Sequence, residues 1–138
     1  MVSTVEKVLF LKGVDLFKTV PGEQLTHVAE ITAEAEYHPE DVVFSEGDQG
    51  DAMYLIVCGK ARVHVGSQVL AELGPKECFG EMAILDAKPR SASVSALTDL
   101  TLLKIEHTDF AEILAEKPEI STEIIKVLTE RLREANKR

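Results

Sequence analysis

The first 32 residues have the spacing of amphipathic helices. Apolar residues recur mainly at intervals of three and four, and the pattern is interrupted at Pro21-Gly22. The apolar positions are Val5, Val8, Leu9 and Leu16 before this interruption and Leu25, Val28, Ala29 and Ile31 after it. Because residues three and four apart share one face of a helix, and Pro-Gly interrupts helices, the pattern predicts two helices within residues 4–32.

From Ala33 to about Glu106 the apolar residues alternate with polar ones or form short β-branched runs. Gly, Pro and Asp separate these runs. The runs lie at 33–38, 41–44, 53–58, 61–65, 69–73, 91–96 and 100–106. Strands at this regular spacing predict a β-sandwich or a β-barrel.

Helical periodicity returns after residue 106. Thr108 is placed to cap a helix that runs through Ala115, and Pro118 suits the first turn of a last helix that runs nearly to the C-terminus. In this last helix a coiled-coil-like seam is formed by Ile125, Leu128, Leu132 and Ala135. We interpret the seam as packing on the core of the domain itself, with self-association as the alternative.

The composition is that of one compact domain. The chain has 138 residues, of which 45% are hydrophobic and 28% are charged. A domain of this size buries enough surface to need no disulfide or metal. The formal net charge of −9 disfavours nucleic acid as the main partner. Most of this charge lies between Glu30 and Asp51, where eight acids occur without a base, so the rest of the chain is nearly neutral and can bind a small anion.

Other kinds of chemistry find little support. Cys58 and Cys78 lack metal-ligand spacing and a nearby His, and we interpret them as reduced thiols, which predicts a cytoplasmic protein. The longest apolar runs are too short to span a membrane. The four histidines are scattered, and no nucleophile–base or paired-carboxylate arrangement can be argued. We therefore expect neither a metal site nor an enzyme.

The segment 78–96 has features that a β-barrel does not itself require. Gly80 opens a short turn of small and apolar residues, and the first backbone N–H groups of such a turn point outward and form an anion site. Gly80 allows close backbone approach, and Ala83 leaves room beside a ligand. Arg90 follows Pro89, which stiffens the segment, and a guanidinium beside exposed N–H groups suits bidentate recognition of a phosphate.

Glu81 does not fit a simple phosphate site, because a carboxylate repels a bound anion. The conflict disappears if the ligand also has hydroxyl groups, since a carboxylate accepts hydrogen bonds from a ribose. These residues therefore predict a sugar phosphate joined to an apolar group.

Two segments resemble a known family. Residues 79–93 read FGEMAILDAKPRSAS and resemble the phosphate-binding cassette of the cyclic nucleotide-binding domain family. Residues 44–54 read FSEGDQGDAMY and, with Gly59 after them, resemble the strand, glycine turn and strand of the same family. We interpret these glycines as turn formers that serve the fold. The resemblance covers nearly the whole chain.

The resemblance implies an α+β, mainly β fold. This fold is an eight-stranded antiparallel β-roll, a double-stranded β-helix of jelly-roll type, flanked by N-terminal helices and by C-terminal hinge and lid helices. The whole chain, 1–138, would be a single cyclic nucleotide-binding domain. Its parts would be N-terminal helices over 1–32, a β-roll over 33–106 with the cassette at 79–93, and hinge and lid helices over 107–138.

The resemblance also assigns roles to residues that match the family motif. Glu81 would bind the ribose, Arg90 the phosphate, and backbone amides of the cassette would contact the phosphate as well. The implied ligand-binding residues are Gly80, Glu81, Met82, Ala83, Arg90 and Ser91, with no catalytic residue, metal ligand or cofactor. Candidates for contact with the base are Val63, Leu73, Phe79 and Met82 on the barrel wall and Ile124 and Leu128 on the lid.

The sequence therefore favours a non-catalytic sensor of a cyclic nucleotide. We expect cAMP as the ligand, with cGMP as the alternative, because Ser91 alone does not distinguish them. Binding would move the helices after Thr108 and so act on an effector domain or a partner protein. A homodimer through the last helix is a further interpretation. Two other functions stay open: an interaction domain of the same fold that binds no nucleotide, and a small barrel enzyme, which is the least supported.

Overall fold

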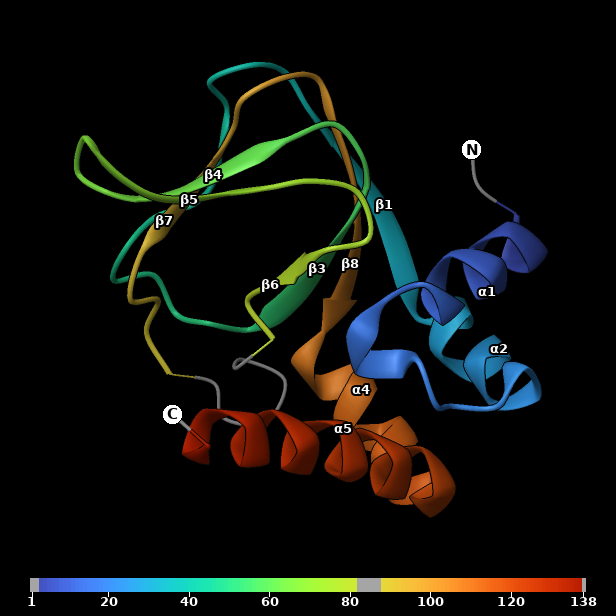
Figure 1. Ribbon diagram of the computed structural model, residues 1–138. Coiled ribbons are helices and arrows are strands. Elements are labelled where there is room, and N and C mark those ends of the chain that lie inside the picture. The colour runs from blue at the N-terminus through green and yellow to red at the C-terminus, as the bar shows by residue number, and fades with distance from the viewer. Residues whose placement is uncertain (1–2, 82–87, 138) are drawn as a thin grey trace.

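The computed structural model describes residues 3–81 and 88–137, which form a β-roll with the helices gathered on one side of it (Figure 1). Among these residues, two four-stranded antiparallel sheets have the strand orders β1-β8-β3-β6 and β2-β7-β4-β5. The strands are β1 (Thr32–Tyr37), β2 (Val42–Phe44), β3 (Ala52–Cys58), β4 (Ala61–Val65), β5 (Gln68–Leu73), β6 (Cys78–Phe79), β7 (Ser93–Ala96) and β8 (Leu100–Glu106). Side chains of both sheets meet between them, so the expected jelly-roll class of fold is confirmed.

The strand pattern of the sequence matches this arrangement with two differences. Periodicity alone predicted seven strands and missed β6, because a strand of two residues is too short to alternate. The run expected at 91–96 begins as a strand only at Ser93. The residues before it pair instead with a turn: the N–H of Arg90 donates to the carbonyl of Asp48 at 2.7 Å, and the N–H of Gly47 donates to the carbonyl of Arg90 at 2.8 Å.

Helices precede and follow the strands. The described helices are α1 (Thr4–Lys12), the 3₁₀ helix η1 (Asp15–Phe17), α2 (Gly22–Glu30), α4 (His107–Glu116) and α5 (Pro118–Asn136). The two helices expected near the N-terminus are confirmed, but the expected apolar face of the first is wrong at Val5 and Leu9, which are 69% and 65% exposed. The face that packs against the core holds Val8, as expected, and Leu11, which was not among the expected positions.

Helix α4 begins directly where β8 ends. Its first residue is His107, one position before the expected cap at Thr108, and no side chain caps it. The reason is a backbone contact, because the N–H of His107 donates to the carbonyl of Asp51 at 2.8 Å. The start of β3 therefore does what a capping side chain would otherwise do.

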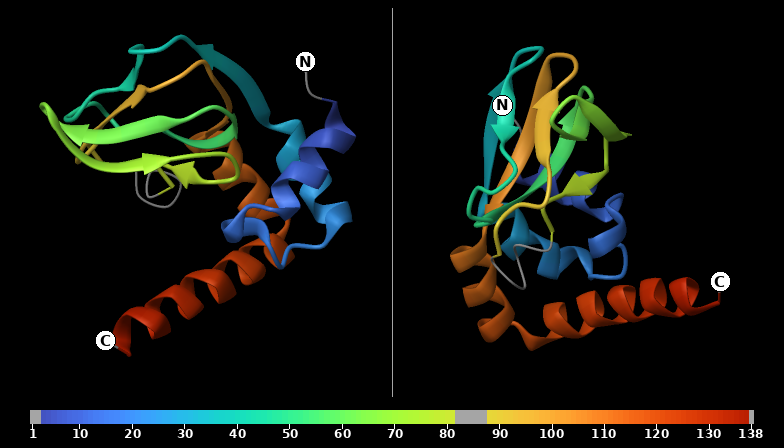
Figure 2. Two further views of the ribbon diagram at one scale, coloured as in Figure 1. Left: turned by 45° about the horizontal axis from the view of Figure 1, so that its top comes forward. Right: turned by 90° about the vertical axis from the view of Figure 1, so that its left-hand side faces the viewer.

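Helix α5 packs through a different face from the one expected. It buries Ile120, Ile124 and Val127, whereas Ile125 and Leu132 are 61% and 62% exposed. The expectation that the seam packs on the core of the domain is thus wrong at Ile125 and Leu132. Helix α5 extends past the body of the domain, so that its C-terminal end stands clear of the β-roll (Figure 2).

The interior is divided into two hydrophobic cores. The roll core lies between the sheets and consists of Ala52, Tyr54, Ile56, Ala61, Phe79, Val94, Ala96, Leu100 and Leu102. The helical core lies between one sheet and the helices and consists of Leu11, Val14, Leu16, Phe17, Val20, Leu25, Val28, Ala29, Met53, Leu55, Leu103, Ile105, Phe110, Ile113, Ile120 and Ile124. Strands β3 and β8 contribute to both, because successive side chains of a strand point to opposite faces.

Candidate functional site

A cavity of about 310 Å³ opens beside the roll core. Strands β2, β4, β6 and β7 supply one side of it, and the segment before β7 supplies the other. The described residues that line it are Phe44, Val63, Phe79, Gly80, Lys88, Pro89, Arg90, Ser91, Ala92 and Val94. Apolar groups thus form one part of the lining, and a cationic segment forms the rest, as is common in ligand sites.

The backbone of this cationic segment is fixed by the turn at 47–50. Besides the two hydrogen bonds of Arg90, the N–H of Gly50 donates to the carbonyl of Lys88 at 3.0 Å. Gln49 forms an isolated antiparallel bridge with Pro89. The glycine turn that the sequence analysis assigned to the fold alone therefore also positions Arg90.

The guanidinium of Arg90 lies inside the protein, with only 9% of the residue exposed. Its Nη2 donates to the carbonyl of Ala52 at 2.6 Å and its Nη1 to the carbonyl of Gly80 at 3.5 Å. Its Nε is buried without a hydrogen-bond partner among the described residues. Burial lowers the pKa of Arg90 from its ordinary value.

None of the ion pairs within residues 3–81 and 88–137 includes Arg90. Buried charges in proteins are usually paired. Moving a charge out of water costs roughly several kcal/mol, and an opposite charge nearby offsets this cost. The carbonyl oxygens supply part of this compensation. Two of the five N–H groups of the guanidinium donate to these carbonyls, so a buried guanidinium that lines a cavity and has N–H groups to spare is suited to bind an anion.

Gly80 is required by its contact with Arg90. Its φ of +73° is a conformation that residues with side chains rarely adopt. A Cβ at this position would lie 2.6 Å from Nη1 of Arg90 and 3.1 Å from the carbonyl oxygen of Ala52. The close approach expected of this glycine is thus made to the arginine.

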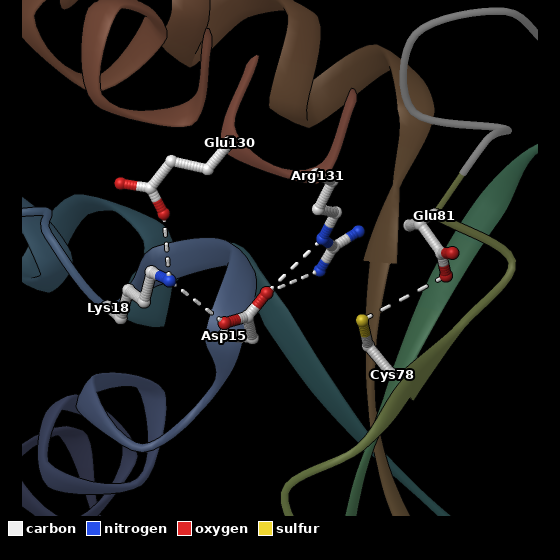
Figure 3. A network of polar contacts seen from close by, with 6 residues as sticks. All are labelled: Asp15, Lys18, Cys78, Glu81, Glu130 and Arg131. Carbon is white, nitrogen blue, oxygen red and sulfur yellow. Dashed lines mark hydrogen bonds and ion pairs between the residues drawn. The ribbon is translucent and has the colours of Figure 1, made fainter. Parts of the chain in front are cut away.

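Glu81 is not brought to the cavity. Its carboxylate accepts a weak hydrogen bond from Sγ of Cys78 at 3.9 Å (Figure 3), and it does not line the cavity with Arg90. Burial, and to a smaller extent the Glu81 carboxylate, raises the pKa of the Cys78 thiol to about 12. The structure thus groups Gly80, Arg90 and Ser91, while Glu81 faces elsewhere and Met82 and Ala83 lie outside the described residues.

The residues expected around the base are divided in the same way. Val63 and Phe79 line the cavity, as expected, but Leu73 does not; Met82 lies outside the described residues. Ile124 and Leu128 of α5 pack on the helical core and not over the cavity. Among the contributors that sequence reasoning missed are the ring of Phe44 and the carbonyl of Ala52. A backbone carbonyl has no signal in a sequence, and Phe44 lies far along the chain from the cassette.

Ion pairs attach α5 to η1 at the surface (Figure 3). Nη2 and Nε of Arg131 donate to Oδ2 of Asp15 at 2.9 and 3.2 Å. Nζ of Lys18 lies 3.3 Å from Oδ1 of Asp15 and 3.1 Å from Oε2 of Glu130. The hydrogen bonds from Arg131 are the main reason that the pKa of Asp15 is lowered from its ordinary value. These contacts join α5 to η1 on the same helix whose Ile124 and Leu128 pack on the helical core.

Two other kinds of site were sought in the part of the chain that the structure describes. No group of three His, Cys, Asp or Glu side chains there could hold a metal ion. No described helix is both long and apolar enough to cross a membrane.

Known proteins resemble this chain over most of its length. A family model described as "Cyclic nucleotide-binding domain" matches residues 34–117. A cyclic AMP receptor protein of Thermus thermophilus is 36% identical over 131 residues, which cover 91% of this chain and 61% of that protein. A cyclic nucleotide-gated potassium channel of Mesorhizobium japonicum is 40% identical over 90 residues, which cover 65% of this chain and 25% of the channel. The chain therefore spans less than two thirds of each of these relatives.

A solved structure agrees with these matches. The N-terminal domain of a transcriptional regulator from Streptomyces coelicolor superposes with a TM-score of 0.87 at 33% identity, covering 93% of this chain and 95% of that one. The similarity thus extends over both the β-roll and the helices.

Proposed function

The chain belongs to the cyclic nucleotide-binding domain family, and from this premise we propose that it is a non-catalytic regulatory module that binds cAMP at Arg90. The observation that supports this most is the buried guanidinium of Arg90, which lines the cavity with a free Nε and without an ion-pair partner among the described residues. A cyclic phosphate supplies the missing negative charge and accepts hydrogen bonds from guanidinium and backbone N–H groups.

The rest of the nucleotide follows from the shape of the cavity. With the phosphate at Arg90 and at the amides of Gly80 and Ser91, the base would lie against the apolar side formed by Val63 and Phe79. Glu81 would accept from the ribose 2′-hydroxyl, for which its carboxylate must turn away from Cys78. The base is the only part that differs between cAMP and cGMP, so the groups that contact the base would decide the preference.

We further propose that binding acts on the C-terminal helices through the start of β3. The carbonyl of Ala52 accepts from Arg90 at 2.6 Å, and the neighbouring carbonyl of Asp51 accepts from the first N–H of α4 at 2.8 Å. A phosphate that binds this guanidinium would change the strength of the hydrogen bond to Ala52, one residue from the contact that holds α4. A ligand shifts helices only through such differential contacts.

The partner that receives this signal is proposed to be a second copy of the chain or an attached effector domain. The exposed Ile125 and Leu132 of α5 lie seven residues apart, as the same position of a heptad repeat does. A homodimer through α5 would cover these side chains.

Calorimetric titration with cAMP and with cGMP tests the ligand and the site together. Arg90→Ala should weaken binding at least about 30-fold, because removing one member of a buried charge pair costs roughly 2–5 kcal/mol. Arg62→Ala is the matched control: this arginine lies on β4 next to Val63, pairs with Glu40 at 3.4 Å and does not line the cavity, so affinity should be unchanged.

Two results would overturn parts of the proposal. If neither nucleotide binds at millimolar concentration, the sensor function is wrong and the interaction domain without nucleotide becomes the better hypothesis. If both bind and Arg90→Ala retains full affinity, the ligand is right but the site is wrong.

A further inference from the structure

The guanidinium of Arg90 lies over the ring of Phe44. The distance from Cζ of Arg90 to the ring centroid is 4.0 Å, well inside the roughly 6 Å over which the negative face of an aromatic ring attracts a cation. Because Arg90 is buried, water competes little for this charge. The contact is therefore of the kind in which a ring contributes most to holding a cation.

Phe44 is itself held by two other rings of the roll. Its centroid lies 5.9 Å from that of Tyr54 and 5.8 Å from that of Phe79. Tyr54 and Phe79 stack at 5.2 Å with an interplanar angle of 14°. Three rings from β2, β3 and β6 thus form one cluster, and the ring of Phe44 is the one in contact with the guanidinium.

An irregularity in β2 directs Phe44 to this place. Val42 pairs with Ser95 and Phe44 with Val94, so two steps along β2 match one step along β7. Such a bulge changes the direction of the side chains that follow it. As a result Val43 and Phe44 both pack against the roll core, while Val42 is 53% exposed.

The ring and two carbonyls hold the guanidinium and leave three of its five N–H groups without a hydrogen bond among the described residues. Phe44 covers one face, and the carbonyls of Ala52 and Gly80 accept from the two terminal nitrogens. The Nε has no partner among the described residues. An arginine side chain has high conformational entropy, so fixing it before the ligand arrives removes a cost of binding.

We propose that Phe44 is a positioning residue for ligand binding: its ring fixes the guanidinium of Arg90, a residue that lines the cavity, in the orientation in which it binds an anion. This inference rests on the proposed function in that the anion is the phosphate of a cyclic nucleotide. Phe44 acts through Arg90 and not on the base. Its loss therefore weakens cAMP and cGMP by the same factor, because both have the same cyclic phosphate.

Replacement of Phe44 by 3,4,5-trifluorophenylalanine tests the electrostatic part of this role. Fluorine withdraws electron density from the ring face and leaves the shape of the side chain nearly unchanged. Calorimetry should show about threefold to tenfold weaker binding of both nucleotides. The matched control is the same replacement at Phe17, a buried ring of the helical core that does not line the cavity; affinity there should change by less than about twofold.

Phe44→Leu removes the ring entirely and should weaken both nucleotides by about tenfold. Equal losses for the fluorinated rings at 44 and 17, no loss at 44, or a loss for one nucleotide only would each overturn the proposal. Thermal unfolding of every variant shows whether the compared affinities belong to folded proteins. If Phe44→Leu does not fold, the fluorinated variant alone decides the test.

A measurement without ligand separates this proposal from the proposed function. In the NMR spectrum of the free protein, the Nε–H of Arg90 should give a resolved signal, shifted upfield by the ring and protected from solvent exchange. The signal should move and broaden in Phe44→Leu but not in Phe79→Leu. An unchanged signal in Phe44→Leu overturns the positioning role, whether or not a nucleotide binds. Failure of both nucleotides to bind a wild-type protein that shows the shifted signal overturns the proposed function alone.

Discussion

The roll core and the helical core share two strands and yet differ in chemistry. Tyr54 and Leu102 point into the roll core, and their neighbours Leu55 and Leu103 point into the helical core. The helical core is mainly aliphatic, with one pair of rings, Phe17 and Phe110, at 6.1 Å. The roll core contains several rings and borders a buried cation. Because side chains alternate along a strand, one sheet contributes to the helical core with one face and to the roll core beside the cavity with the other.

The difference shows what a protein needs in order to bury a charge beside a core. Arg90 is accommodated because two carbonyls accept from it and a ring lies under it. Aliphatic side chains such as those around Leu103 offer neither hydrogen-bond acceptors nor a negative face. The roll core can therefore support an anion site, and the helical core supports the packing of the helices.

Adjacent leucines on β8 give the strongest test of this division. Leu102 and Leu103 are both fully buried, one in each core. Leu102→Ala and Leu103→Ala should each lower the free energy of unfolding by about 2–5 kcal/mol, because each leaves a cavity. Urea titration measures this loss. Only Leu102→Ala should also weaken cAMP binding in calorimetry, since it loosens the core that supports the rings.

Equal effects of the two substitutions on cAMP affinity would contradict the division. The comparison is well controlled, because the two variants remove the same atoms from neighbouring positions of one strand. Calorimetry at a temperature where both variants are folded excludes an effect of unfolding.

The two faces of α5 extend the comparison to an exposed apolar surface. Its inner face is part of the helical core, whereas Leu132 on the outer face is 62% exposed. Leu132→Glu should change the unfolding free energy of the monomer by no more than about 0.5 kcal/mol. It should abolish self-association in sedimentation velocity, because a dimer through α5 would have to bury the new charge.

Lys126→Glu is the matched control for this variant. It adds negative charge to an exposed position of α5 outside the seam, and the dimer should persist. If the wild type sediments as a monomer at all concentrations, or if both variants dissociate alike, the proposed dimer through α5 is wrong.

The order of the elements and the place of Arg90 could be predicted from the sequence because both depend on local signals. Alternation marked the strands, and Pro89 with Arg90 marked a stiff cationic segment before β7. Periodicity was less informative for α5. Apolar residues occur on more than one side of that helix, and only the position of its neighbours decides that Ile124 is buried and Ile125 exposed.

The fine structure of the site could not be predicted because it depends on non-local contacts. Phe44 and Arg90 are 46 positions apart, and their contact requires the bulge in β2 and the ring cluster. The contact of Glu81 with the Cys78 thiol is local, but it is a weak hydrogen bond that no sequence pattern indicates. Neither contact has a sequence signal of its own. The motif therefore predicted a class of ligand, but it did not predict the contacts that Arg90 and Glu81 make in the structure.

The ion pairs between α5 and η1 should have the smallest effect, since they lie at the edge of the helical core and not within it. Asp15 and Arg131 are about half exposed, with side-chain exposures of 55% and 40%, so Arg131→Ala should lower the free energy of unfolding at pH 7 by less than about 1 kcal/mol. The folded state lowers the pKa of Asp15, chiefly through Arg131. The ion pair therefore contributes its full stabilisation above the ordinary carboxyl pKa of about 4, and this stabilisation is lost as the pH falls through the pKa that Asp15 has in the folded protein. Urea unfolding of the wild type and of Arg131→Ala at pH 7 and pH 3 measures it, and the difference between the two proteins should shrink at the lower pH. If the difference in unfolding free energy is the same at both pH values, Arg131 stabilises α5 by packing of its aliphatic stem and not by its charge. The edge of the helical core would then be stabilised by apolar contacts, as its centre is.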